Sequence, residues 1–193
     1  MTHPCVAKVA ESVLVLRQSD LTGAIEENTH IVPEVYFSAD SANGTAAVEL
    51  LPRQDALLKV RVTVTGLPDW LTFNIGMGEG RFQARDTLGV VAEVSTDLKA
   101  ESDFRATPFI RSDQMGDTHF AAGFALSTEA QPASLLHPVT SADALTYGSV
   151  YHTLVLPLPK RTMTLTVHAL RLIHMDASEG LSAEMAKLGC FAV

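Results

Sequence analysis

Hydrophobic and polar residues alternate with period two along much of the chain, which is typical of β-strands that bury one face. The clearest run covers residues 58–65 (Leu-Lys-Val-Arg-Val-Thr-Val-Thr), and a second alternating run covers residues 71–77. The sequence Gly-Leu-Pro-Asp at 66–69 between them is typical of a turn, so we expect the two runs to form an antiparallel pair. Further strand candidates are 13–16, 45–51, 88–95, 104–110, 119–126, 151–158 and 163–174.

The order of these candidates indicates the fold class. No amphipathic helical pattern alternates with the strands, which disfavours a parallel α/β sheet. We therefore predict an all-β protein with an antiparallel β-sandwich or jelly roll. One short C-terminal helix is the exception, because Asp176 or Ser178 can cap its start and Gly189 can end it. Its apolar face would consist of Leu181, Met185 and Leu188.

The size of the chain favours one domain. Its 193 residues and 20.7 kDa fit a single β-sandwich domain over residues 1–193 better than two independent cores. Within this domain we expect residues 1–34 to form an N-terminal arm and residues 176–193 a C-terminal helical appendage. Residues 26–33 and 131–147 are predicted to be long connections rather than interdomain linkers, because strand candidates continue on both sides of them.

Composition excludes several classes of protein. Hydrophobic residues make up 47% of the chain and charged residues 19%, so the chain is not disordered, and no uncharged apolar run is long enough to cross a bilayer. The formal net charge is -8, whereas nucleic-acid binding depends on clustered lysines and arginines. We expect no nucleic-acid partner and no membrane insertion.

The two cysteines, Cys5 and Cys190, stand near opposite ends of the chain and are too few for a disulfide-built scaffold. Two free thiols are favoured; the alternative is one bond between them if the termini meet. The N-terminus has no basic start followed by an apolar stretch of signal-peptide length. We expect synthesis in the cytoplasm without a signal peptide, which is also compatible with incorporation into a virus-like particle.

Glycine, acidic residues and histidine occur in arrangements that suggest cofactor or metal sites, but none has the required spacing. The glycine-rich stretch 76–80 lacks the spacing of phosphate-binding loops, so we predict a flexible hairpin whose charged continuation, 81–86, faces solvent. Asp113, Asp117 and His119 leave a structural calcium open, but without an EF-hand loop an ordinary acidic turn is favoured. The histidines without a zinc-type spacing include His152, His168 and His174. We predict no cofactor and no metal.

Catalytic motifs are equally sparse. The chain contains no Gly-x-Ser-x-Gly nucleophile motif. A pair of carboxylates across a groove could still cleave a polysaccharide, with one acid and one nucleophile or base. The available carboxylates are Glu79, Asp86, Glu93 and Asp117.

Sugar binding by a sandwich needs an aromatic platform beside planar hydrogen-bonding groups. Trp70 is the first candidate platform, since it lies off the apolar face of its strand and shares the other face with Asn74. Tyr151 is a second candidate platform. Arg81 and Asp86 are candidate partners for sugar hydroxyls.

Several segments resemble the jelly-roll or lectin-like sandwiches that bacteria and phages use to recognise polysaccharides. They are Leu-Gly-Val-Val-Ala-Glu-Val at 88–94, Gly-Asp-Thr-His-Phe at 116–120 and Tyr-His-Thr-Leu-Val-Leu-Pro-Leu-Pro at 151–159, followed by 163–172. The resemblance is one of strand and turn patterns. It implies a carbohydrate-binding domain without cofactor chemistry, as in the adhesive part of a phage or phage-like particle.

Three hypotheses follow. The leading one is a non-catalytic carbohydrate-binding module that recognises a cell-surface polysaccharide. The alternatives are a structural or decoration subunit of a protein assembly and a polysaccharide-cleaving enzyme. Because single sugar sites bind weakly and gain strength by multivalency, we also expect a homo-oligomer or a larger assembly.

Overall fold

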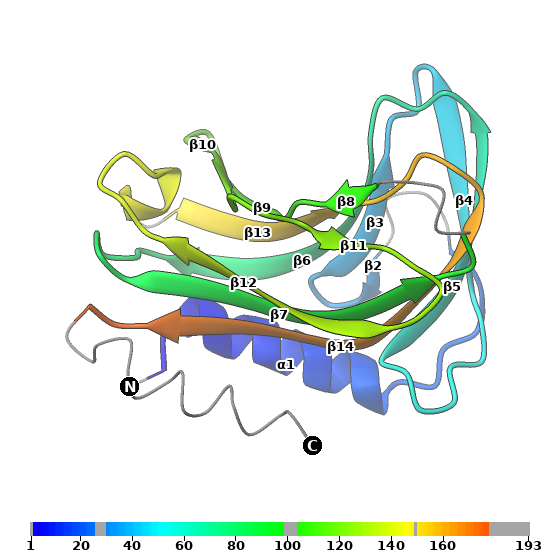
Figure 1. Cartoon of the computed structure of the whole chain (residues 1–193), viewed down its shortest axis with the longest axis horizontal. Helices are drawn as coiled ribbons and strands as arrows, with labels where there is room; N and C mark the ends of the chain where they lie inside the picture. The colour runs from blue at the N-terminus through cyan, green and yellow to red at the C-terminus, as the bar shows by residue number, and fades with distance from the viewer. Residues whose placement is uncertain (1, 26–29, 99–103, 149, 178–193) are drawn as a thin grey trace.

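The computed structural model of this chain describes residues 2–25, 30–98, 104–148 and 150–177, and Figure 1 shows that they form two packed β-sheets. The first sheet, here called the β14 sheet, has six strands in the order β1-β4-β5-β14-β7-β12. The second, here called the β13 sheet, has six strands in the order β10-β9-β13-β6-β3-β2. All their pairings are antiparallel, which confirms the prediction of an all-β antiparallel sandwich.

The strands of the β14 sheet are β1 (Gly23–Ile25), β4 (Gly44–Leu50), β5 (Leu58–Gly66), β7 (Thr87–Thr96), β12 (Gln131–Pro138) and β14 (Met163–Met175). Those of the β13 sheet are β2 (His30–Val32), β3 (Val35–Ala39), β6 (Leu71–Gly80), β9 (Phe109–Ser112), β10 (Gly116–His119) and β13 (Val150–Pro157). A two-stranded sheet joins β8 (Arg105–Ala106) to β11 (Phe124–Ala125), and the helices are α1 (Pro4–Gln18) and the 3-10 turn η1 (Ala144–Thr146).

Alternate residues of each strand fill the space between the two sheets. Phe73 and Ile75 of β6 and Val60 and Val62 of β5 are all at most 1% exposed, while their sequence neighbours point away from the core. Burying such side chains stabilises the fold by roughly 1.5–3 kcal/mol each. In β5 and β6 the period-two pattern of the sequence therefore reports the two faces of the strand correctly.

The pairing predicted for the runs 58–65 and 71–77 is wrong. Both runs are strands, but β5 pairs with β4 and β14, whereas β6 pairs with β3 and β13. The turn between them carries the chain from one sheet to the other, and Gly66 at its start has a φ of +77° that other residues adopt at a cost. Alternation and turn residues alone do not distinguish such a crossing from a hairpin.

The α-helix of the described residues is N-terminal, where the sequence predicted an arm and a short strand. Residues 13–16, predicted as a strand, form the later turns of α1. Pro4 occupies the first turn, where its missing N–H is harmless, and the His3 ring accepts a hydrogen bond from the Cys5 N–H (3.3 Å). The buried residues of α1 are Cys5, Val9, Ser12 and Leu16, at helical spacing. Of the predicted helical appendage 176–193, residues 178–193 lie outside the described residues.

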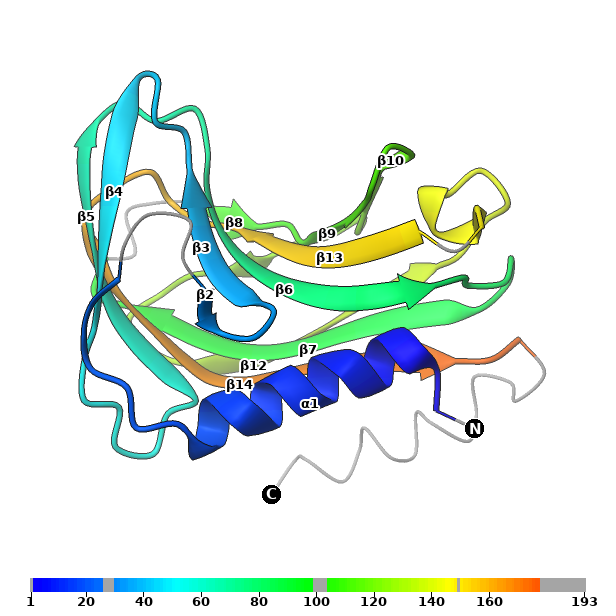
Figure 2. The same ribbon diagram turned by 180° about the vertical axis from the view of Figure 1, so that it is seen from behind.

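Helix α1 covers one open side of the sandwich, as Figure 2 shows. Within β6 only residues 71–75 pair with β3, and within β14 only residues 163–167 pair with β5. The remaining half of each long strand therefore has one unpaired edge, and α1 packs against both β6 and β14 there. Cys5 is fully buried in this interface with a free thiol, and burial raises its pKa to about 11. Cys190, its predicted alternative partner, lies outside the described residues.

Strand β12 is absent from the sequence prediction, which made residues 131–147 a connection. Pro132 and Pro138 obscure the strand pattern, since proline cannot donate to a sheet ladder. The strand nevertheless forms because it is an edge strand that pairs only with β7, leaving one side free of ladder bonds. No helix in the described part of the chain is long and apolar enough to span a membrane.

Candidate functional site

The face of the β13 sheet that points away from the core, here called the outer face, is the candidate site. In Figures 1 and 2 the central strands of the β14 sheet and helix α1 lie on the other side of the β13 sheet. Strand β10 at one edge, and the β3–β4 connection beside the N-terminal end of β6, rise above β13 and β6, so the sheet is curved around this face (Figure 2).

One row of side chains crosses the outer face from β10 to β2. The register places His119, Phe109, Val155, Asn74, Tyr36 and His30 side by side on successive strands. Phe109 and His119 have ring centroids 5.1 Å apart, and His30 stacks on Tyr36 with centroids 5.0 Å apart and an interplanar angle of 14°. The row thus has an aromatic pair on each side of Asn74.

Asn74 is the unusual residue of this row. It is only 4% exposed although it is on the outer face, and its Nδ2 has no hydrogen-bond partner among the described residues. A buried donor without a partner costs roughly 1–3 kcal/mol, so native folds rarely contain one without a reason. Its cross-strand neighbour Val155 is apolar and only 2% exposed. The Asn74 amide therefore lies beside a buried apolar side chain on this face.

A second row lies next to the first. It runs from Asp117 through Arg111 and Thr153 to Gly76. Arg111 donates from Nε and Nη2 to the two carboxylate oxygens of Asp117, at 3.1 and 3.2 Å, and this bond raises the pKa of Arg111. The guanidinium also lies 5.4 Å from the centroid of the Phe109 ring. Arg111 is therefore held in place and presents a planar set of donors on the face.

Tyr151 and Glu34 meet above Gly76. The hydroxyl of Tyr151 donates a hydrogen bond to the Glu34 carboxylate, and a Cβ at Gly76 would collide with both groups. Glu34 has a φ of +70°, a left-handed conformation that costs a non-glycine residue about 1–3 kcal/mol, and its carbonyl accepts the Gly76 N–H at 2.7 Å. Burial, followed by this hydrogen bond, raises the pKa of Tyr151.

The stretch 76–80 is not the flexible hairpin that the sequence suggests, because it forms the end of β6. Gly76 pairs with Thr153 and Gly78 with the preceding residue of β13, so Met77 forms a β-bulge. Gly78 has a φ of +73°, and a Cβ at Gly80 would strike the Cys5 sulfur of α1. The glycines serve the bulge, the contact with α1 and the meeting of Tyr151 with Glu34.

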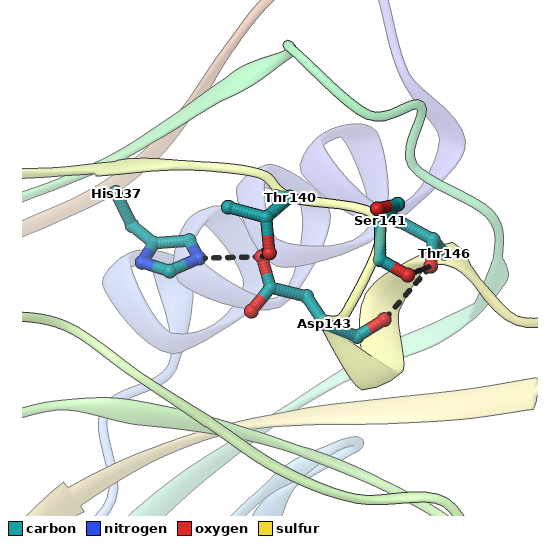
Figure 3. Close-up of polar contacts among 5 residues, drawn as sticks. All are labelled: His137, Thr140, Ser141, Asp143 and Thr146. Carbon is teal, nitrogen blue, oxygen red and sulfur yellow. Dashed lines mark hydrogen bonds and ion pairs between the residues drawn. The ribbon is translucent and has the colours of Figure 1, made fainter.

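A polar network fixes the turn that supports the β9–β10 edge of the outer face (Figure 3). Asp143 accepts hydrogen bonds from the His137 ring at 3.0 Å and from the backbone and hydroxyl of Thr140 at 2.6 and 3.1 Å. Thr146 donates to the carbonyl of Asp143 at 2.8 Å and to that of Ser141 at 3.4 Å. These bonds close the turn around η1, which packs against both β9 and β10.

The five predicted site residues divide into two groups. Asn74 and Tyr151 lie together on the outer face, and Trp70, which is 49% exposed, stands one residue before β6 with its carbonyl bonded to the Asp40 N–H (3.1 Å). Arg81 and Asp86 lie elsewhere. Arg81 donates to the Thr146 carbonyl at 2.9 Å, and Asp86, only 3% exposed, contacts the His174 ring at 2.8 Å.

The other polar candidates have structural partners. Asp113 begins the turn between β9 and β10, and Asp117 is the partner of Arg111. His152 is fully buried between the Ser112 hydroxyl and the Gly80 carbonyl, and His168 contacts Ser95 at 3.0 Å. Across the ranges that the structure describes, no group of three or more histidines, cysteines and carboxylates is arranged to hold a metal ion.

Sequence reasoning missed several residues of the outer face. Tyr36 belongs to the short strand β3, which was not predicted, although Val-Tyr-Phe-Ser-Ala does alternate. Phe109 and Arg111 belong to β9, and alternation would have placed them on one face. What the sequence could not supply is the pairing of β9 with β13 and of β3 with β6, which brings these side chains to Asn74.

No known protein family and no curated protein matches the chain by sequence. Among solved structures, one described as "CBM4 structure and function", a carbohydrate-binding module, matches with a TM-score of 0.53 at 14% identity, covering 79% of this chain and 94% of that one. The β-sandwich therefore shares its fold with this structure.

Two further solved structures resemble the chain less closely, with TM-scores below 0.5. A cyclase from Fischerella sp. TAU in complex with 4-(1H-indol-3-yl)butan-2-one matches at 0.48 and 10% identity, over 84% of this chain and 94% of that one. The enzymatically active domain of bacteriophage CBA120 tailspike protein 4 matches at 0.45 and 10% identity, over 74% of this chain and 19% of that one.

Proposed function

We propose that this chain is a non-catalytic carbohydrate-binding module whose glycan lies on the outer face of the β13 sheet. The observation that carries the proposal is Asn74, a buried amide with an unpartnered Nδ2 between two aromatic pairs. A sugar hydroxyl would accept from this amide and remove the cost of leaving it unpaired. The fold, shared with a CBM4 structure, supports the proposal.

The other residues of the face would contact the glycan by stacking or by hydrogen bonding. The rings of Tyr36 and Phe109 offer apolar surfaces on which the C–H faces of sugar rings can stack. Arg111 and Asp117, fixed against each other, offer planar donors and acceptors for hydroxyl groups on the same side. Trp70, at the start of β6, would extend the platform along the strand.

A more specific part of the proposal concerns the biological source of the glycan. We assign it to a bacterial cell-surface polysaccharide, with this chain acting as the adhesive part of a phage-like particle. An open face with few hydrogen bonds gives weak binding at each site, and a particle that carries many copies raises the overall strength without new contacts. The same reasoning favours a homo-oligomer, which light scattering of the purified protein would detect.

The test is binding to a panel of soluble polysaccharides by affinity electrophoresis, with reducing ends assayed in the same samples. Asn74→Ala should abolish retardation by the bound glycan while leaving the free energy of unfolding unchanged or higher, because the variant removes an unpaired donor. Thr118→Val is the matched control. Its hydroxyl is also buried and unpartnered, but Thr118 points to the core side of β10, so this change should leave binding intact.

Two other outcomes would redirect the assignment. New reducing ends would make the protein a polysaccharide-cleaving enzyme. No binding across the panel would favour a structural or decoration subunit, a role that the exposed side chains of Leu67 (82%) and Trp70 (49%) on the β5–β6 turn would suit. In that case both variants, Asn74→Ala and Thr118→Val, would behave alike in every binding assay.

A further inference from the structure

Tyr151 is surrounded by carboxylates from three separate elements. Glu34, before β3, accepts the hydrogen bond from its hydroxyl. Glu79 stands directly opposite Tyr151 in the β6–β13 ladder. Asp113, after β9, donates its backbone N–H to the Tyr151 carbonyl at 3.0 Å, and the charges of Glu34 and Asp113 both contribute to the raised pKa of Tyr151. The part of the outer face around this ring, here called the Tyr151 subsite, is acidic.

The lysines and arginines near the subsite already have hydrogen-bond partners, and Arg81, directly after β6, donates to the Thr146 carbonyl at 2.9 Å. Within β2, β3, β6, β9, β10 and β13 the only lysine or arginine is Arg111, and both its Nε and its Nη2 bond to Asp117. Lys8, which packs beside Gly78, bonds to Glu11 on the same helix at 3.4 Å. Glu34, Glu79 and Asp113 therefore leave the Tyr151 subsite with a net negative charge next to an aromatic ring.

A second, independent observation indicates that a ligand belongs here. Asn74 lies two residues before Gly76 on the same face of β6, and the Tyr151 hydroxyl lies over Gly76. The unpartnered Nδ2 of Asn74, which is 4% exposed, is therefore the neighbour of the acidic ring along the strand. One sugar unit could bond to this amide while the next unit, or a substituent, reaches Tyr151.

From these observations we propose that the Tyr151 subsite binds a protonated amino group, so that the preferred glycan is a polymer containing unacetylated amino sugars. This inference rests on the proposed carbohydrate-binding function and specifies its substrate class. An ammonium group gains from the aromatic face and from the charge of nearby carboxylates. A uronic acid or a sulfated sugar would meet Glu34, Glu79 and Asp113 as like charges and be rejected.

The experiment compares two oligosaccharides of equal length, an oligomer of glucosamine and its fully N-acetylated form, by calorimetry at a pH where the amines are protonated. Exposed ion pairs contribute about 0.2–1 kcal/mol each, so we expect the amine form to bind about five- to tenfold more tightly at low salt. Because such pairs are screened by salt, the advantage should shrink at 0.5 M NaCl, while binding of the N-acetylated form changes little.

Variants separate local recognition from general attraction of a cation to a protein of net charge -8. Glu79→Gln and Asp113→Asn should each lower the affinity for the amine form about two- to fivefold and leave the N-acetylated form unaffected. Glu93→Gln is the matched control, because this substitution removes one negative charge from β7, a strand of the other sheet. Circular dichroism checks that each variant keeps the fold.

Each outcome decides between the two proposals. Equal affinities, or tighter binding of the N-acetylated form, would overturn the amino-sugar inference and keep the proposed function, provided that Asn74→Ala abolishes binding. An equal effect of Glu79→Gln and Glu93→Gln would also overturn it, since it would show general attraction only. No Asn74-dependent binding to any glycan of the panel would overturn both. The expected pattern, in which Glu79→Gln acts and Glu93→Gln does not, supports both.

Discussion

The Tyr151 hydroxyl of β13 donates a hydrogen bond to the Glu34 carboxylate across the backbone of β6, at the position where Gly76 has no side chain. The two residues are 117 positions apart in sequence, and they come together because β13 and the turn before β3 flank the same strand. The pair closes over β6 beside Asn74 and shapes the proposed binding face.

Gly76→Ala tests this relationship. The new Cβ would overlap both the Tyr151 hydroxyl and the Glu34 carboxylate, so the pair must separate. We expect a loss of about 1–3 kcal/mol in the free energy of unfolding, as for other overpacked positions, together with weaker glycan binding. Urea unfolding measures the first effect and affinity electrophoresis the second. Gly148→Ala is the control, because a Cβ there meets no atom of the described residues within 4 Å. Equal results for the two variants would contradict the role of the Tyr151–Glu34 pair.

Alkaline pH should weaken the same pair. Burial and the hydrogen bond to Glu34 raise the pKa of Tyr151, so folding favours its neutral form. The resulting stability is fully present below the ordinary tyrosine pKa of about 10 and is lost as the pH rises above it. Denaturant unfolding at a series of pH values from 8 to 11 should show this decline in the native chain. It should be shallower in Tyr151→Phe, and parallel curves would argue against the shifted pKa.

Acid pH should act where α1 begins, next to the C-terminal end of β6. Burial lowers the pKa of His3, whose ring stacks on Phe82 (centroids 4.0 Å apart) and faces His174, Asp86 and His152. Burial also lowers the pKa of His152. A lowered histidine pKa contributes stability above the unfolded value of about 6.5, and this stability is lost as the pH falls below it.

The measurement is Tm between pH 8 and pH 5. His3→Asn keeps an acceptor for the Cys5 N–H but carries no titrating group, so its Tm should fall less over this range than that of the native chain. If the two chains lose the same Tm between pH 7 and pH 5, His3 does not couple folding to pH.

The sequence predicts individual strands of this protein well and their arrangement poorly. Alternation identifies β5, β6, β7, β13 and β14, and it places Asn74 opposite the apolar face of its strand. These features are local, because the side-chain period of a strand depends only on neighbouring residues. Strand pairing depends on residues far apart in the sequence. The prediction therefore paired β5 with β6, although the two strands lie in different sheets.

The candidate site depends on pairing and was therefore predicted only in part. Asn74 and Tyr151 were identified from the chemistry of their side chains, but their neighbours Tyr36 and Phe109 come from strands whose partners the sequence does not specify. Arg81, predicted for the same site, follows β6 by one residue and turns toward η1 instead. Because β6 ends one residue before Arg81, the alternation of the strand does not determine where this side chain points.

Arg53 provides the last prediction, and no sequence pattern marks it. Its guanidinium, from the connection between β4 and β5, donates to the carbonyls of Leu16 and Arg17 in the last turn of α1 and of Ser19, the C-cap residue. It also donates to the carbonyl of Leu57. The bonds to Arg17 and Leu57 measure 2.6 and 2.8 Å. The last carbonyls of a helix have no partner in the regular backbone ladder, and a cation is also favoured at the negative end of the helix dipole.

Arg53→Ala should therefore lower the free energy of unfolding by about 2–3 kcal/mol, because it leaves these carbonyls without a charged donor. Arg53→Lys should recover only part of the loss, since an ammonium group cannot reproduce the planar set of donors. Urea unfolding measures both variants. Arg171→Ala, which removes an exposed arginine from β14, is the control and should change stability little.

The same variants should also change access to Cys5. Its thiol is buried between α1 and the unpaired edge of β6, so it reacts with a thiol reagent only when the helix moves away. In a Cys190→Ser background, Arg53→Ala should accelerate the reaction of Cys5 with a disulfide reagent by about tenfold or more, following the loss of helix anchoring. Arg171→Ala should leave the rate unchanged. A reaction rate that is the same in Arg53→Ala and the native chain would show that α1 stays in place without Arg53.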